Sequence, residues 1–457
     1  MNQLNNSYWR PILTVIAFFA IVSLYFTIFL PYMTEEGRYS LASLEMYFTH
    51  YFWQPTNYGH FYGRPPFYNW VSLPLMYWLG PQQVLVAGRI VAASASALMG
   101  LVLWFFAFRL YKNALFALFT VALFFSGDML FRRSWVAAPD TLFALCTFTG
   151  IAAMWLSVKE NRAIYWLLVP FTLFAAMLSK ALTAYVFYFT ALLVIWIASE
   201  HKSNLFKPAS ILAHIAILIL PLLWFMLLPN SRWHDMLGDI SSRAVNHSFS
   251  LLRYLEKLLF STFDVILRLA PVDLLAFYCW YRYPSDHKPI KELTWICILS
   301  FLPYWLSTAY LAPRYLLPIL PFAAIIFGYY IWNAGIKMIR ITIIVLAIEL
   351  LCKTIGSFVG LPWFESVYYN QQTVAQDILK RTQGQSLYTV DLGNGFGIAI
   401  SSYIDALIWP QHPLLAAPDS SFSGCVISNS PQTSYGRLLQ TYTIHTHKDF
   451  FIYLYCK

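Results

Sequence analysis

The chain is short of charged residues, and this shortage excludes an ordinary soluble protein. Only 11% of its 457 residues are Asp, Glu, Lys or Arg, whereas an average soluble domain carries about 25%. Hydrophobic residues make up 59% of the chain and aromatic residues 19%. Together with repeated apolar runs of about 20 residues, this composition predicts a polytopic α-helical membrane protein.

The sequence also lacks the short motifs that bind soluble nucleotides, activate a serine nucleophile or hold structural zinc. It contains no G-x-x-x-x-G-K-[ST], no G-x-G-x-x-G, no G-x-S-x-G and no C-x-x-C. If the protein is a transferase, its donor must arrive without a soluble nucleotide, and a lipid-linked phosphate donor meets that need. Cys425 and Cys456 lie in the polar C-terminal residues and could pair in an oxidising compartment.

Basic residues are scattered over the short loops between apolar runs, so the net charge of +9 does not indicate nucleic-acid binding. Membrane lipids with anionic headgroups, or phosphates, are better partners. Residues 12–30 predict a retained first span with a cytoplasmic N-terminus, and the basic loops then predict a C-terminus outside the cell membrane. The expected total is about eleven spans. After the first, they cover residues 84–109, 114–126, 141–158, 163–179, 181–199, 209–228, 259–281, 293–309, 315–332 and 341–360.

The change in composition after residue 360 predicts two domains. Residues 1–360 form a transmembrane domain with long extracytoplasmic loops at 32–83 and 229–258. Residues 361–457 are expected to form a small extracytoplasmic α/β domain, of a size usual for a domain. Its expected elements are a helix at 373–381 and strands at 386–390, 442–445 and 450–454.

Two adjacent carboxylates, Glu35 and Glu36, follow the first span. They would open an amphipathic helix lying on the membrane, whose apolar stripe is Gly37, Leu41, Leu44 and Phe48. The pair could position a cation or accept a proton from an acceptor hydroxyl or amine. The alternative is a negatively charged helix N-terminus without a catalytic role.

Further charged residues fall at what would be the outer ends of spans or in outer loops. Arg64 precedes a Pro-Pro corner and is a candidate phosphate clamp, as is Arg314. Either arginine could instead reach lipid headgroups from the interface. Asp140 could be an ordinary helix N-terminal residue, and Lys180 either anchors a turn or binds an anion. Arg243 lies in the long loop 229–258.

The order of these residues resembles that of a known family. TEEGRY at residues 34–39 and YGRPPFYNW at residues 62–70 look like the acidic-pair and Lys-Pro-Pro motifs of bacterial C-type-fold membrane glycosyltransferases. The similar proteins are the aminoarabinose:lipid A transferases and the protein O-mannosyltransferase-like group. Asp140, the Ser-Lys turn at residues 179–180 and RYLLP at residues 314–318 fit their later motifs, so the resemblance covers about residues 10 to 335.

The resemblance implies an inverting enzyme that takes a sugar from a polyprenyl-phosphate donor of the undecaprenyl-phosphate type. The acceptor would be lipid A, an envelope glycan or a protein, on the periplasmic side of a bacterial inner membrane. Glu35 would be the catalytic base or the acceptor-orienting group. The implied substrate-binding residues are Glu36, Arg38, Tyr39, Arg64, Tyr68, Asp140, Lys180, Arg243, Arg314 and Tyr315.

The chain departs from the family pattern at four positions, one of which is Leu311, where many relatives have Lys. Glu35 stands where the family usually has Asp, Arg64 replaces the usual Lys, and Gly63 stands where the aminoarabinose branch has a proposed metal-ligating Glu. A divalent metal ion is therefore left open. The alternative function is a non-catalytic transporter, flippase or binding protein for polyprenyl-linked sugars, which would also need outer arginines.

Overall fold

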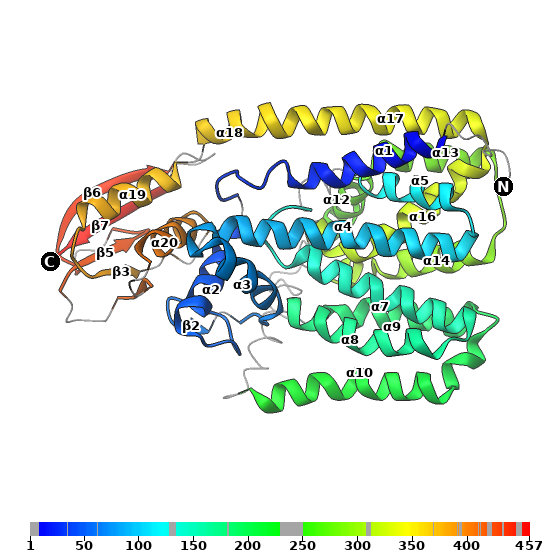
Figure 1. The fold of residues 1–457 in the computed structure, drawn as a ribbon, viewed down its shortest axis with the longest axis horizontal. Helices are drawn as coiled ribbons and strands as arrows, with labels where there is room; N and C mark the ends of the chain where they lie inside the picture. The colour runs from blue at the N-terminus through cyan, green and yellow to red at the C-terminus, as the bar shows by residue number, and fades with distance from the viewer. Residues whose placement is uncertain are drawn as a thin grey trace. The chain divides into compact units, whose positions relative to one another are not determined.

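The computed structural model of the chain is mostly helical (Figure 1). It describes residues 9–33, 35–61, 63–127, 134–180, 182–228, 250–307, 312–368, 370–390, 392, 395–409, 411, 413–417, 423–431, 434–444 and 450–457. The Cα packing divides the chain into two compact units. The helical unit is Met1–Tyr25, Ala93–Trp135 and Pro139–Thr354, and the mixed unit is Phe26–Ala92, Val136–Ala138 and Ile355–Lys457.

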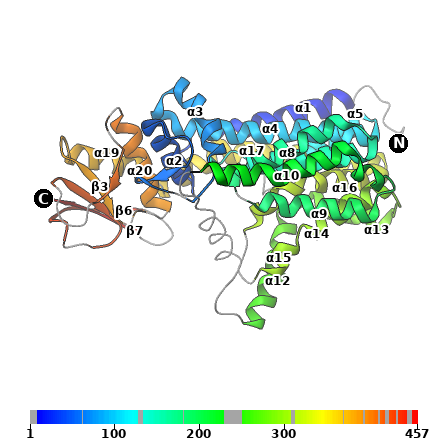
Figure 2. The ribbon, with the colours of Figure 1, turned by 90° about the horizontal axis from the view of Figure 1, so that it is seen from below.

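Neighbouring helices of the helical unit pack along their apolar faces. α7 packs on α8, α10 packs on α8, and α5 contacts both α1 and α16. Figure 2 shows α12 beside α15 in the same unit. The bounds are α1 (Trp9–Val22), α5 (Ala114–Phe124), α7 (Asp140–Glu160), α8 (Ala163–Lys180), α9 (Thr183–Ala198), α10 (Pro208–Leu227), α12 (Leu251–Leu267), α13 (Val272–Arg282), α14 (Lys288–Leu299), α15 (Leu302–Leu306), α16 (Leu320–Asn333) and α17 (Ile336–Ile355).

Among the described residues, five helical segments are long and apolar enough to cross a membrane. They are Pro81–Tyr111, Asp140–Glu160, Ala163–Lys180, Pro208–Leu227 and Pro313–Asn333. α1, α5 and α9 are apolar but shorter. The total of about eleven spans stays a prediction.

Two of the expected spans are each divided into two helices. The span expected at 259–281 is interrupted between α12 and α13, where Pro271 occupies the N-cap of α13. The span expected at 293–309 is interrupted between α14 and α15, which has Pro303 in its first turn. Proline lacks an N–H and has a fixed φ, so it favours the start of a new helix over the middle of a long one.

The mixed unit combines helices with a five-stranded sheet of order β4-β3-β5-β7-β6. β3 pairs in parallel with β4 and β5, whereas β7 pairs antiparallel with β5 and β6. Side chains of α19, α20 and the strands share one core, which includes Ile378, Ile400, Ile427 and Ile452. The bounds are α2 (Glu36–Thr49), β1 (Thr56–Asn57), β2 (His60–Phe61), α3 (Phe67–Leu79), α18 (Leu361–Tyr368), α19 (Gln371–Arg381), β3 (Leu387–Val390), α20 (Gly395–Ile408), β4 (Leu415–Ala416), β5 (Cys425–Ser428), β6 (Arg437–Ile444) and β7 (Phe450–Cys456).

The helix expected after the first span is present as α2, but the expected surface position is wrong. Leu41 and Leu44 of the predicted stripe are buried, and so are Ala42 and Glu45 on another face. The cause is α20, which packs so closely that a Cβ on Gly37 would lie 2.6 Å from Cα of Ala399. α2 is therefore an interior helix of the mixed unit.

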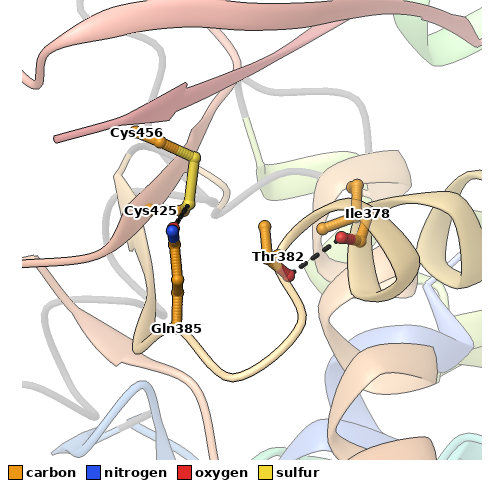
Figure 3. The surroundings of a disulfide bond; sticks show 5 residues. All are labelled: Ile378, Thr382, Gln385, Cys425 and Cys456. Carbon is orange, nitrogen blue, oxygen red and sulfur yellow. Dashed lines mark hydrogen bonds between the residues drawn. A yellow bond between two sulfur atoms is a disulfide. The ribbon is translucent and has the colours of Figure 1, made fainter.

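A disulfide joins Cys425 of β5 to Cys456 of β7 (Figure 3). The amide end of Gln385 contacts Sγ of Cys425. At the end of α19, Oγ1 of Thr382 donates a hydrogen bond of 2.8 Å to the carbonyl oxygen of Ile378. These contacts anchor both ends of the turn between α19 and β3.

Asp405, on α20, is a buried acid whose Oδ1 accepts a hydrogen bond of 2.8 Å from the backbone N–H of Leu414. Burial raises the pKa of the Asp405 carboxyl well above its usual range. The folded protein therefore keeps a proton that the unfolded chain releases at about pH 4. This difference makes the free energy of unfolding fall as the pH rises above that value.

We expect Asp405→Asn to remove this part of the pH dependence, because the amide does not ionise. The measurement is thermal unfolding at a series of pH values from about 4 to 7. Asp377→Asn is the control, since Arg381 holds the pKa of that carboxyl below its usual range. The contribution of Asp377 therefore changes only below about pH 4, and this substitution should leave the slope between about pH 4 and 7 unchanged. An Asp405→Asn protein with the slope of the unmodified chain would contradict the assignment.

Candidate active site

Four of the site residues predicted from the sequence come together in the helical unit. They are Asp140, Lys180, Arg314 and Tyr315, and we call them the Asp140 cluster. Nζ of Lys180 forms an ion pair with Oδ1 of Asp140. Nε of Arg314 lies 4.0 Å from Oδ2 of the same carboxylate. Nζ of Lys180 also lies 4.2 Å from the centre of the Tyr315 ring, a distance typical of a cation–π contact.

Local sequence explains why these side chains meet. Asp140 is the first residue of α7, and Lys180 is the last residue of α8. The two helices are joined by a short turn and pack together, so the start of α7 and the end of α8 lie at the same end of the pair. An acid at a helix N-terminus and a base at a C-terminus are both favoured by the helix dipole. Arg314 and Tyr315 follow Pro313, the first residue of a 3-10 segment, η4 (Pro313–Ile319), which packs on α7.

The Asp140 cluster brings charged groups together in a largely water-excluded place. The side-chain exposures are 4% for Asp140, 10% for Lys180 and 18% for Arg314. An ammonium and a guanidinium both approach the same carboxylate there. Such a site favours an anion with several oxygens, and a phosphate matches both an ammonium and a guanidinium.

The acidic pair of the first loop is split by the structure into two different environments. Glu36 is fully buried, and its carboxylate forms a two-bond ion pair with Arg89 of α4 (Val84–Tyr111). Oε1 accepts from Nε of Arg89 at 2.9 Å and from the N–H of Ala137 at 2.7 Å. Oε2 accepts from Nη2 of Arg89 at 2.6 Å and from the N–H of Met33 at 2.8 Å. Glu36 is thus a structural residue in the interior of the mixed unit.

Arg89 is a structural residue to which the sequence analysis gave no role. Its guanidinium, itself fully buried, also donates to the carbonyl oxygens that follow α1. These belong to Thr27 at 3.0 Å, Ile28 at 3.3 Å, Leu30, and Pro31 at 2.6 Å. The signal was a single arginine inside a long apolar run, because a charge in such a setting is costly and needs partners.

Glu35 is the N-cap residue of α2, Arg38 and Tyr39 lie in its first turn, and all three are only partly buried. The Tyr39 ring makes an edge contact with the buried Tyr68 of α3, with ring centres 5.8 Å apart. Arg64 lies partly buried in the turn that ends at Pro66, the N-cap of α3. The binding and catalytic roles of these five residues stay predictions, and Arg243 lies outside the described residues.

Glu45 is a second buried acid of α2 that sequence reasoning did not assign. It accepts hydrogen bonds from the backbone N–H of Tyr58 and, at 3.1 Å, from that of Gly59. Burial raises the pKa of the Glu45 carboxyl. Tyr58 and Gly59 both have positive φ, so Glu45 holds the sharp turn between β1 and β2.

No group of three or more His, Cys, Asp or Glu side chains gathers within the part of the chain that the structure describes. The position that would supply an acidic ligand in the aminoarabinose branch is Gly63, whose φ is +77°. A divalent metal ion stays a prediction from the sequence, and we assign no step of the reaction to one.

No protein-family model matches the chain, and no curated protein sequence does. Solved structures do match it. The chain is similar to ArnT from Cupriavidus metallidurans bound to undecaprenyl phosphate, with 15% identity, a TM-score of 0.70 and coverage of 98% of each chain. The same protein in the apo state gives 15% identity, a TM-score of 0.71 and coverage of 96% and 97%.

The chain has the C-type glycosyltransferase fold. A more distant likeness joins it to the oligosaccharyltransferase AglB from Archaeoglobus fulgidus, in complex with an inhibitory peptide and a dolichol-phosphate. That match has 10% identity and a TM-score of 0.54, and covers 93% of this chain and 69% of the other. The resemblance predicted from the motifs is thus confirmed as a likeness of fold, and the neighbours with the apolar helices identify a membrane protein.

We expect Glu36→Gln to destabilise the folded protein by about 3–5 kcal/mol, because it leaves the Arg89 guanidinium buried without its counter-charge. Glu35→Gln removes a carboxylate at the neighbouring, partly exposed position and is the matched control. The measurement is thermal unfolding of the purified chain in lipid nanodiscs. Equal effects of the two substitutions would contradict the structural role of Glu36.

Proposed function

We propose that the protein is a membrane glycosyltransferase that moves a sugar from a polyprenyl-phosphate donor to an acceptor. The observation that carries the proposal is the Asp140 cluster, in which two cations share one carboxylate at the ends of packed helices. Support comes from the fold, because ArnT was solved with undecaprenyl phosphate and AglB with dolichol-phosphate. We propose a donor of the undecaprenyl-phosphate type.

In the proposed reaction, Lys180 and Arg314 bind the donor phosphate, and Arg64 adds a third cation. The bond between the anomeric carbon and the phosphate oxygen breaks, and negative charge develops on the leaving phosphate. Fixed cations in a water-poor site stabilise that developing charge more than they stabilise the bound donor. Asp140 positions Lys180 and Arg314 at the proposed substrate site.

Glu35 is the proposed catalytic residue. Glu36 already accepts hydrogen bonds on both oxygens from Arg89 and from backbone N–H groups, so it is unsuited to accept a proton. Glu35 takes the proton of an acceptor hydroxyl or amine as the acceptor attacks the anomeric carbon. Attack opposite the leaving phosphate inverts that carbon. Arg38, Tyr39, Tyr68 and Tyr315 are the proposed lining of the sugar site.

The finer features of the proposal concern location and acceptor. We propose about eleven spans, a bacterial inner membrane, and a C-terminal domain from residue 361 on the periplasmic side. The Cys425–Cys456 disulfide supports this side, because disulfides persist in oxidising compartments. The acceptor is lipid A, an envelope glycan or a protein.

We expect Lys180→Met to weaken binding of undecaprenyl phosphate by about 10- to 100-fold, the usual value of a hydrogen bond to a charged group. The measurement is a titration of the chain in nanodiscs, followed by native mass spectrometry. Lys159→Met is the matched control, because Lys159 also ends a helix and also pairs with a buried acid, Glu292, at 2.8 Å. Equal affinities of the two variants would contradict the phosphate role of Lys180.

We expect Glu35→Gln to abolish sugar transfer while the protein stays folded. The measurement is intact-mass analysis of envelope lipids and proteins from cells that carry either form. Loss of a hexose- or pentose-sized increment, with accumulation of the polyprenyl-phosphate sugar, is the expected result. Transfer at the normal level would sink the assignment of Glu35. No change in any glycan or lipid-linked sugar when the whole chain is removed would favour a binding or structural role.

A further inference from the structure

A cavity of about 790 Å³ opens in the mixed unit, between the ends of α19 and α20 and the starts of β3 and β4. Its volume lies in the range of about 300–1,000 Å³ that is usual for small-ligand pockets. None of the residues proposed above for sugar transfer lines it. It is therefore a separate feature of the molecule.

Among the described residues, the lining of this cavity carries no charged side chain. Its polar part consists of the amides of Gln383, Gln385 and Gln411 and the hydroxyls of Thr382, Ser386 and Tyr388. A carboxamide both donates and accepts hydrogen bonds, as does a hydroxyl group of a ligand. A phosphate or an ammonium would find no counter-charge here, so the lining favours a neutral ligand rich in hydroxyls.

The apolar part of the lining includes Trp409, whose side chain is 38% exposed. The indole is held in place by Tyr47 and Phe48 of α2, with ring centres 5.2 Å and 5.1 Å away. A pyranose ring presents C–H groups on its faces and hydroxyls at its edge. The exposed indole can pack against such a face while the amides pair with the edge.

The rim of the cavity is fixed before any ligand arrives. The backbone N–H of Gln385 donates to the carbonyl oxygen of Thr382 at 2.9 Å, and its amide end lies against the disulfide sulfur of Cys425 (Figure 3). On the opposite side, Asp405 accepts the N–H of Leu414. A preformed rim reduces the entropy lost when a ligand binds.

From these observations we infer that the cavity is a binding site for a neutral saccharide. The inference goes beyond the proposed function and does not require it. If sugar transfer is correct, the saccharide bound here belongs to the acceptor. A peptide is less well suited, because the neighbouring edge strand, β4, has only two residues on which an added strand could form.

The test uses the full chain in phosphatidylcholine nanodiscs, without any donor. Methyl glycosides of glucose, galactose, mannose and N-acetylglucosamine are titrated and followed by saturation-transfer NMR. Methyl glucuronoside and an uncharged Ser-Thr-Gln peptide are the comparison ligands. The variant is Gln383→Ala with Gln411→Ala, two exposed side chains, and the matched control is Gln376→Ala, which is exposed on α19 but does not line the cavity.

We expect at least one neutral glycoside to bind, and the double substitution to weaken it by about tenfold, as the loss of two hydrogen bonds implies. Gln376→Ala should leave the affinity unchanged, and Trp409→Phe should weaken it with little change in melting temperature. Binding should persist in Glu35→Gln, which separates this site from the transfer reaction. Absence of binding for all four glycosides, equal affinity in the double variant and the control, or binding of the peptide alone would overturn the inference.

Discussion

The mixed unit depends on the ion pair between Arg89 and Glu36. Burying two charges is costly, and the cost is offset only when the geometry is good and the remaining hydrogen-bonding groups are used. Here the guanidinium serves the carboxylate and the carbonyl oxygens of residues 27, 28, 30 and 31 together. The ion pair therefore fixes the chain that enters α2. It also leaves the two adjacent glutamates with different chemistry, because one is fully bonded in the interior and the other begins a helix partly exposed.

The Asp140 cluster also combines basic and acidic side chains, but with two basic side chains to one acidic side chain. In the Arg89–Glu36 pair one cation meets one carboxylate with two hydrogen bonds, so the charges are matched and the side chains are locked. In the Asp140 cluster two cations meet one carboxylate, and one of them lies 4.0 Å away. A carboxylate locked to one guanidinium suits structure, whereas an ammonium and a guanidinium held side by side suit the binding of an anion. We therefore assign the Arg89–Glu36 pair to folding, and the donor role of the Asp140 cluster is the proposal made above.

The sequence predicted the parts that depend on local pattern. Asp140, Lys180 and Arg314 were recognisable because charges at the ends of apolar runs are rare. The α19 helix and strands β3 and β7 lie where side-chain periodicity predicted them, whereas β6 (Arg437–Ile444) begins five residues before the strand expected at 442–445. The partners of α2 were not recognisable, because α20 lies far along the chain and only the fold brings Ala399 against Gly37. The breaks before α13 and α15 were missed for a different reason: hydropathy averages over a proline that restarts the helix.

The low content of charged residues bears on both proposed binding sites, the one for phosphate and the one for a neutral saccharide. In a chain with 11% charged residues, a cluster of two cations and a carboxylate is a specific feature, and it is where we propose that the donor phosphate binds. The cavity beside Trp409 has the opposite character, because its described lining residues are uncharged. The charge of each site would therefore distinguish a lipid-linked phosphate donor from a neutral saccharide, independently of the detailed shape of the site. In the proposal, phosphate is attracted by Lys180 and Arg314, and a neutral sugar has no charge to desolvate when it binds among the glutamines.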